Sequence, residues 1–245
     1  MSNFIEIVSL QKSFDDRTVL DDLNLKIKEG KLMSIVGPYG SGKTTFLKIL
    51  AGLTEGYKGS VTIAGLEPRK LREKGMVGYC FQKPNLLPWL DVEKNLLLPA
   101  LLRKTAPTID VNKLLKLAKL TSIKKSKINE LSGGTRQMVS ILRSLSLSPK
   151  VLLLDEPFSS IDEISREKLQ EDLLAIHRKT VKTTILITHS ISEAVFLSDE
   201  IAIFSQKPTS IKKLMPIKLD RARADVRNTE AFNKYVTIVR KQLSA

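Results

Sequence analysis

The segment that most constrains the fold runs from Gly37 to Thr45 and reads Gly-Pro-Tyr-Gly-Ser-Gly-Lys-Thr-Thr. It contains the G-x-x-x-x-G-K-[ST] pattern of a phosphate-binding loop. The apolar residues 31–36 before it predict a strand, and residues 46–50 after it predict the start of a helix. Strand, glycine-rich loop and helix in this order form the context that the pattern requires. A plain glycine turn is the alternative, but it gives no packing reason for the Lys-Thr pair.

All nine residues of this loop are expected to bind nucleotide. They are Gly37, Pro38, Tyr39, Gly40, Ser41, Gly42, Lys43, Thr44 and Thr45. The glycines allow the backbone to approach an anion closely, and the N–H groups at the start of the helix point at it. We expect Lys43 to reach the β- and γ-phosphates and the Thr44 hydroxyl to hold Mg²⁺. Tyr39 is bulky for such a loop, but its position mainly supplies backbone.

The length and composition predict one large globular domain, or one domain with an inserted subdomain, of unusual charge. The chain has 245 residues, 42% hydrophobic content and a net charge of +14. That charge suits nucleic acid, an anionic membrane surface or a polyanionic ligand. A single cysteine, Cys80, excludes an internal disulfide framework and a cysteine-rich zinc site. With neither a signal peptide nor an apolar run of membrane-spanning length, we expect a cytoplasmic protein.

Apolar strands alternate with helices along the chain and predict an α/β fold with a mostly parallel sheet. The predicted strands cover residues 4–14, 17–28, 59–64, 75–81, 151–154, 183–188 and 200–204. The predicted helices cover residues 162–179, 192–197 and 231–243. Between residues 91 and 145 the pattern is helical throughout, which indicates an insertion in the α/β chain.

An acidic pair, Asp155 and Glu156, follows the apolar run 151–154. A strand that ends in an acid places a carboxylate beside bound phosphates, so Asp155 is expected to hold Mg²⁺. Glu156 is placed to orient or deprotonate a water that attacks the γ-phosphate. A helix cap is the structural alternative for such a pair.

The segment Leu131-Ser132-Gly133-Gly134-Thr135-Arg136-Gln137 is a further candidate anion site. Its glycines expose N–H groups where a helix begins, although a Ser-Gly-Gly turn would give the same pattern. At this point the sequence resembles a family, because the segment looks like the signature of ATP-binding cassette (ABC) ATPases. By this resemblance Ser132, Gly133, Gly134 and Gln137 act on the nucleotide of a second subunit.

The same resemblance extends to further positions. Gln82 matches the glutamine loop, which in the family contacts Mg²⁺ and the attacking water. His189 matches the switch histidine that donates a hydrogen bond to the γ-phosphate, and Asp162 ends a loop that contacts the opposite subunit. Phe14 matches the aromatic residue that stacks on adenine, although a core phenylalanine is the competing interpretation. Together with Lys43, Glu156 and His189 are the expected catalytic residues.

The family resemblance implies a P-loop NTPase core with an N-terminal antiparallel β subdomain and an inserted α-helical signature subdomain. We therefore expect one ABC ATPase domain over residues 1–245. Its core takes residues 1–90 and 146–206, its helical subdomain about 91–145, and a basic C-terminal extension 207–245. The resemblance also implies ATP and Mg²⁺ as ligands and a nucleotide-sandwich homodimer.

Segments around the motifs resemble one subgroup. Residues 81–89 and 187–194 are similar to the nitrate, sulfonate and taurine importers. This implies an ATPase subunit peripheral on the inner face of the cell membrane, with permease subunits and an extracytoplasmic solute-binding protein as partners. The alternative is a soluble ABC ATPase acting on nucleic acid or ribosomes. Because the basic stretches lack interleaved aromatic residues for base stacking, no nucleic acid is expected. A small-molecule kinase is disfavoured by the signature and by Glu156.

Overall fold

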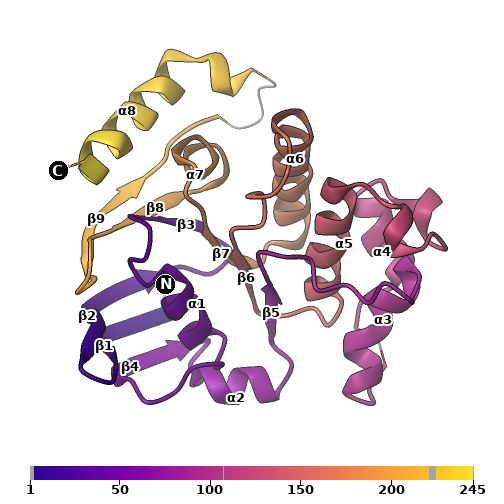
Figure 1. Cartoon of the computed structure of the whole chain (residues 1–245), viewed down its shortest axis with the longest axis horizontal. Helices are drawn as coiled ribbons and strands as arrows, with labels where there is room; N and C mark the ends of the chain where they lie inside the picture. The colour runs from indigo at the N-terminus through magenta and orange to yellow at the C-terminus, as the bar shows by residue number, and fades with distance from the viewer. Residues whose placement is uncertain (1–2, 107, 221–224, 245) are drawn as a thin grey trace.

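Two sheets organise the chain (Figure 1). The structure is a computed structural model that describes residues 3–106, 108–220 and 225–244. The larger sheet has the strand order β5-β6-β7-β3-β8-β9 and is parallel except for the β8–β9 pair. Its strands are β3 (Leu32–Val36), β5 (Val77–Cys80), β6 (Val151–Asp155), β7 (Thr183–Ile187), β8 (Glu200–Phe204) and β9 (Ile211–Pro216).

The smaller sheet is antiparallel and lies near the N-terminus, with the order β2-β1-β4. Its strands are β1 (Ile5–Phe14), β2 (Arg17–Ile27) and β4 (Lys58–Ile63). Asp15, with φ of 49°, lies in the two-residue turn between β1 and β2. The turn requires this left-handed backbone, and aspartate is among the residues that tolerate it.

Helices cover both faces of the larger sheet. They are α1 (Lys43–Leu50), α2 (Pro68–Glu73), α3 (Val92–Leu102), α4 (Val111–Leu117), α5 (Gly133–Leu145), α6 (Glu163–Thr180), α7 (Ile191–Leu197) and α8 (Glu230–Ser244). Short 3₁₀ turns lie at Thr121–Ile123, Ile128–Glu130 and Val226–Asn228. In Figure 1 α1 lies between the two sheets, α3 to α5 form the lobe at the right, and α8 runs along the top.

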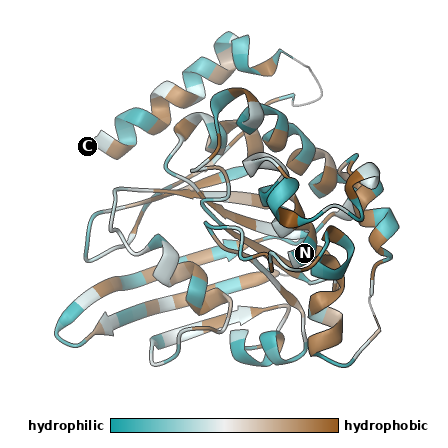
Figure 2. Ribbon diagram, turned by 45° about the vertical axis from the view of Figure 1, so that its right-hand side comes forward, coloured by the Kyte–Doolittle hydropathy of each residue, from teal (hydrophilic) through white to brown (hydrophobic). Residues whose placement is uncertain are grey.

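Every residue of β3, β6 and β7 is buried. Alternate side chains of these strands enter two separate cores, since successive residues of a strand point to opposite faces. One core packs Met33, Leu153 and Ile185 against α1 and the antiparallel sheet. The other packs Leu154 and Leu186 against α3 to α8. The strands are therefore mostly apolar on both faces, as in parallel sheets covered on both sides (Figure 2).

The predicted fold class is confirmed, and the structure adds two elements that sequence patterns did not indicate. Strand β9 reads Ile-Lys-Lys-Leu-Met-Pro and is mostly exposed, because it pairs only with β8 at the sheet edge. Helix α2 spans six residues with Pro68 at its start, too short for a periodic pattern. The expected extension 207–245 thus begins inside a β-hairpin; its residues 221–224 and 245 lie outside the described residues. Over the residues described, no helix is long and apolar enough to cross a membrane.

Cys80, at the end of β5, is buried with 1% of its surface exposed. Burial raises the pKa of its thiol to about 11, so the thiol stays protonated at pH 8. We expect iodoacetamide at pH 8 to leave Cys80 of the native protein unmodified and to alkylate it rapidly after unfolding. Mass spectrometry of the two samples checks this, and rapid stoichiometric labelling of the native protein would contradict it.

Candidate nucleotide site

The predicted phosphate, metal and catalytic residues meet at one edge of the larger sheet. The loop 37–42 joins the end of β3 to α1, and Asp155 is the last residue of β6. Gln82 follows β5 by two residues and His189 follows β7 by two residues. Because parallel strands end at the same edge, their carboxyl ends collect these side chains, as in other open α/β sheets. One pocket is lined by residues 39–45, Gln82, Glu156 and His189, together with Lys207.

The loop closes on its own lysine. Lys43 Nζ donates hydrogen bonds to the carbonyl oxygens of Gly37 at 2.9 Å and Pro38 at 2.8 Å. Gly42, the N-cap of α1, has a φ of 85°, which a side chain would strain. Burial lowers the pKa of the Lys43 ammonium, opposed by the carboxylates of Glu156 and Asp155. The geometry holds a cation at the base of a loop of backbone donors.

Asp155 lies beside the loop with both carboxylate oxygens engaged. Thr44 Oγ1 donates to its Oδ1 at 3.1 Å, and the Tyr79 hydroxyl donates to its Oδ2 at 3.0 Å. A hydroxyl, a carboxylate and the amide of Gln82 are hard oxygen donors of the kind that bind Mg²⁺ together with phosphate. The residues fit this ion. Tyr79, on β5, is a contact that sequence reasoning missed, because no motif marks it.

Glu156 has a φ of 47°, in the left-handed region that costs a non-glycine residue of order 1–2 kcal/mol. This backbone turns the side chain towards His189, whose Nε2 lies 2.6 Å from Glu156 Oε1. Gln82 Nε2 donates to Glu156 Oε2 at 3.3 Å and to Ser159 Oγ at 3.3 Å. The pocket thus holds a carboxylate contacted by a histidine and an amide.

Tyr39 contributes a side chain as well as backbone. It is 94% exposed, and its ring stacks on His189 with centroids 5.9 Å apart. The residue before that histidine, Thr188, donates a hydrogen bond from its hydroxyl to Glu193 of α7. Burial raises the pKa of the Glu193 carboxyl. Thr188 Oγ1 also accepts a hydrogen bond from Ser190 N at 3.0 Å. Neither Thr188 nor Glu193 was predicted from sequence.

The signature residues lie apart from this pocket. Ser132 caps α5, its hydroxyl accepting from Thr135 N at 3.2 Å. A Cβ added at Gly133 would meet no atom within 4 Å, and one at Gly134 would make only ordinary contacts at 3.7 and 3.9 Å. Ser132 and Gly134 line a different pocket, shared with residues of α6. In Figure 1 α5 lies beyond β6 from α1, so one chain does not bring its signature to its own phosphate loop.

Comparison with known proteins decides the family. The ABC transporter family matches residues 20–159, more than half of the chain. The chain belongs to the ABC transporter family. An aliphatic sulfonates import ATP-binding protein, SsuB of Bacillus subtilis (strain 168), is 44% identical over 82% of this chain and 78% of its own length. A protein of the same name from Bacillus cereus is 38% identical over 94% of this chain and 92% of its own length.

Solved structures agree with this ABC transporter assignment. A dimeric bacterial ABC transporter cassette has a TM-score of 0.72 and 29% identity, and the match covers 87% of this chain and 99% of that one. The same cassette in a post-hydrolysis state bound to ADP and Pi matches equally well. The fold of this chain is therefore that of an ABC ATPase cassette.

Of two further residues expected from the ABC transporter pattern, Gln137 is buried and Phe14 is exposed. Gln137 is 1% exposed, with Nε2 3.5 Å from Cys80 Sγ. Its side chain faces the interior on the inward side of amphipathic α5, so it is not presented with Ser132 to a second subunit. Phe14 is 46% exposed, does not line the pocket, and holds Lys12 Nζ 4.6 Å from its ring centroid.

Asp162 is the N-cap of α6 in this ABC transporter cassette. It caps α6 by accepting from Ser165 N at 2.9 Å, and that hydrogen bond lowers the pKa of its carboxyl. The cap fixes the start of the helix that follows the exposed residues Ser159 and Ser160. Its side chain stays exposed.

Proposed function

We propose that this chain is the ATP-hydrolysing subunit of an importer. The observation that carries the proposal is the Glu156–His189 pair, 2.6 Å apart in the pocket of the phosphate loop. A carboxylate there is placed to take a proton from an attacking water, which is the reaction that a P-loop ATPase needs. The ADP- and Pi-bound relative supports this interpretation.

The roles of the pocket residues follow from their positions. Lys43 and the backbone N–H groups of the loop stabilise the charge of the phosphates. Mg²⁺ would be held by Thr44, Asp155 and Gln82, and when bound it neutralises charge that develops on the β- and γ-phosphates. Glu156 accepts the proton of the water, and His189 donates a hydrogen bond to the γ-phosphate.

A second copy of the chain is proposed to complete each site. Ser132 and Gly134 lie at the start of α5 away from their own phosphate loop and line a pocket, and the open space at Gly133 leaves room for a ligand. Helix N-termini favour anions. We assign these residues to the γ-phosphate held by the partner chain's loop, with Asp162 near the same contact. The dimeric relative supports this arrangement.

The transported solute is proposed from the relatives. Their printed names state import of aliphatic sulfonates, and we propose a sulfonate ahead of nitrate.

The permease is proposed to dock in a groove between β5, α3 and α5. The groove is lined by Val77, Tyr79, Phe81, Leu98, Leu102, Arg143 and Leu147. Phe81, which precedes Gln82, is 40% exposed, and Leu102 at the end of α3 is 76% exposed. Because the proposed docking groove includes α3 and α5, the helical subdomain 91–145 would move with the permease.

The proposal extends to the whole complex. We place the chain on the inner face of the cell membrane, with an extracytoplasmic solute-binding protein delivering the sulfonate. A nucleic-acid ATPase is not favoured, since these relatives carry import names.

Hydrolysis and uptake test this function. The purified chain with Mg²⁺ should release phosphate from ATP, and Lys43→Ala should lower the rate about 100-fold or more. Cells that lack the gene should lose uptake of a radiolabelled alkanesulfonate, and the wild-type gene should restore it while Glu156→Gln should not. If cells that lack the gene take up the sulfonate as wild-type cells do, while the purified chain hydrolyses ATP, the importer assignment is overturned and the ATPase assignment stands.

A further inference from the structure

We propose that Lys207 supplies a second side-chain cation to the phosphates of the bound nucleotide. This residue lies outside the family's matched segment and outside every motif considered above. The inference rests on the proposed function, because it assumes that the pocket binds ATP. It deepens that function by adding a binding residue from the β8–β9 turn.

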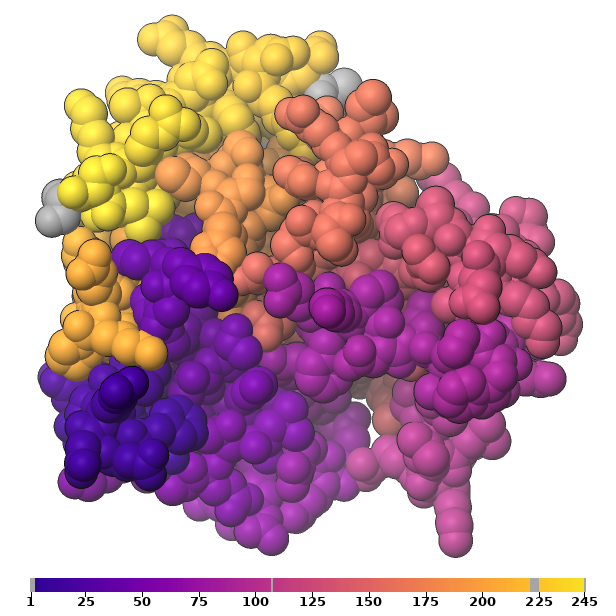
Figure 3. All heavy atoms as spheres, viewed as in Figure 1, coloured from indigo at the N-terminus to yellow at the C-terminus, as the bar shows by residue number. Residues whose placement is uncertain are grey.

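The β8–β9 turn is fixed against the phosphate loop. Thr209 is fully buried, and its hydroxyl donates to the carbonyl oxygen of Ser41 at 2.5 Å. Thr209 N donates to Val19 O at 3.0 Å, and Asp21 N donates to Thr209 O at 2.9 Å. The turn is thus bonded both to the loop and to β2. Figure 3 shows the end of this hairpin against the N-terminal strands.

The turn is also braced internally. Ser205 N donates to Ser210 O at 3.0 Å, and Ser210 N donates to Ser205 Oγ at 2.9 Å. Where β8 ends, Phe204 lies so close to the loop that a Cβ on Gly37 would be 2.9 Å from Phe204 Cβ. The position of Lys207 relative to the phosphate loop is therefore set by packing and by hydrogen bonds.

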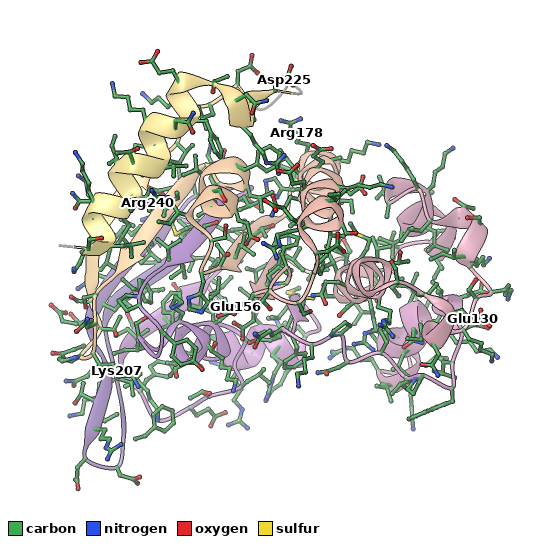
Figure 4. All side chains as sticks on the ribbon, turned by 45° about the horizontal axis from the view of Figure 1, so that its top comes forward. Glu130, Glu156, Arg178, Lys207, Asp225 and Arg240 are labelled. Atoms are coloured by element: carbon green, nitrogen blue, oxygen red, sulfur yellow. The ribbon has the colours of Figure 1, made fainter. Side chains whose placement is uncertain are left out.

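Lys207 lines the same pocket as residues 39–45. Figure 4 shows it at the end of the hairpin, with Glu156 nearer the centre of the molecule. Within residues 3–106, 108–220 and 225–244, no carboxylate forms an ion pair with Lys207, and Glu156, the acid of this pocket, is engaged by His189. An exposed ammonium beside a loop whose N–H groups bind phosphate suits a polyanionic ligand. The phosphates of a bound nucleotide form such a ligand.

Replacing Lys207 should weaken nucleotide binding without loss of fold. We expect Lys207→Ala to raise the Kd of ATP and of ADP about three- to tenfold at low salt, because one charge-assisted contact is lost. The difference should shrink at high salt, where the Debye length falls to about 3 Å at 1 M. A purely structural role for Lys207 would not depend on salt in this way.

The test is a titration of the full chain with a fluorescent ATP analogue and Mg²⁺ at about 50 mM and 500 mM salt. Lys207→Arg should retain most of the affinity, and Lys212→Ala, an exposed lysine of β9 that does not line the pocket, should bind as wild type. Thermal unfolding should be the same for all variants. Lys207→Ala protein that binds ATP as tightly as wild type would overturn the inference. Wild-type protein that binds no ATP would overturn the proposed function itself.

Discussion

Replacing Glu156 by glutamine is expected to lower kcat for ATP hydrolysis by about 10²- to 10⁴-fold, the usual contribution of a general base. Glutamine keeps the shape of the side chain and a hydrogen-bond acceptor for His189, 2.6 Å from the glutamate in this structure. The left-handed backbone at position 156 is unchanged by the substitution, so stability should be unaltered. ATP binding should persist, since Lys43 and the loop N–H groups are intact.

A matched variant separates loss of the base from loss of a charge. Glu200 starts β8 at the opposite edge of the sheet, and burial raises the pKa of its carboxyl. Glu200→Gln therefore removes a half-buried carboxylate far from the pocket and should leave kcat within about twofold, as a substitution away from the site should. Steady-state phosphate release measures both variants. Wild-type turnover by Glu156→Gln protein would sink the assignment of the base.

The residues that the sequence predicted for the site are those whose spacing fixes their place. A parallel strand ends where its apolar run ends, so Asp155, His189 and Gln82 had to meet the phosphate loop at one edge of the sheet. The antiparallel arrangement of the smaller sheet was expected from family resemblance, whereas the helical insertion was already indicated by the helical pattern of residues 91–145. The order of the strands in each sheet was not predicted, since no pattern within one strand specifies its neighbours.

Other contacts depend on tertiary packing and left no pattern to read. Tyr79 reaches Asp155 because β5 pairs with β6, and Lys207 reaches the pocket because the β8–β9 turn bonds to Ser41. Gln137 was expected at a subunit contact, yet the turn of α5 directs it inward. An amphipathic helix buries each side chain on one face, and position 137 lies on that face.

The second large effect is expected at Gly134. Gly134→Asp should fold normally, because an added Cβ makes only ordinary contacts and an acidic residue is favourable in the first turn of a helix. The free energy of unfolding should change by no more than about 1 kcal/mol. Hydrolysis should fall about 100-fold or more, since the carboxylate would repel the γ-phosphate bound by the partner chain.

Asn112→Asp is the control for this substitution. Asn112 is the second residue of α4, as Gly134 is of α5, so the same charge enters the same helical position in the same part of the fold. It accepts a hydrogen bond from Lys124 Nζ at 2.9 Å, which aspartate preserves. Asn112→Asp protein should hydrolyse ATP at the wild-type rate. Equal loss in both variants would assign the effect to charge on the helical insertion in general.

The central claim is that each ATP site is shared between two chains, and mixing two inactive variants tests it most directly. Lys43→Ala removes one half of the site and Gly134→Asp the other, so each homodimer should be nearly inactive. In an equal mixture about half of the dimers are mixed, and one of their two sites is intact. We predict recovery of about a quarter of the wild-type rate of phosphate release. A mixture no more active than its two components would contradict the account.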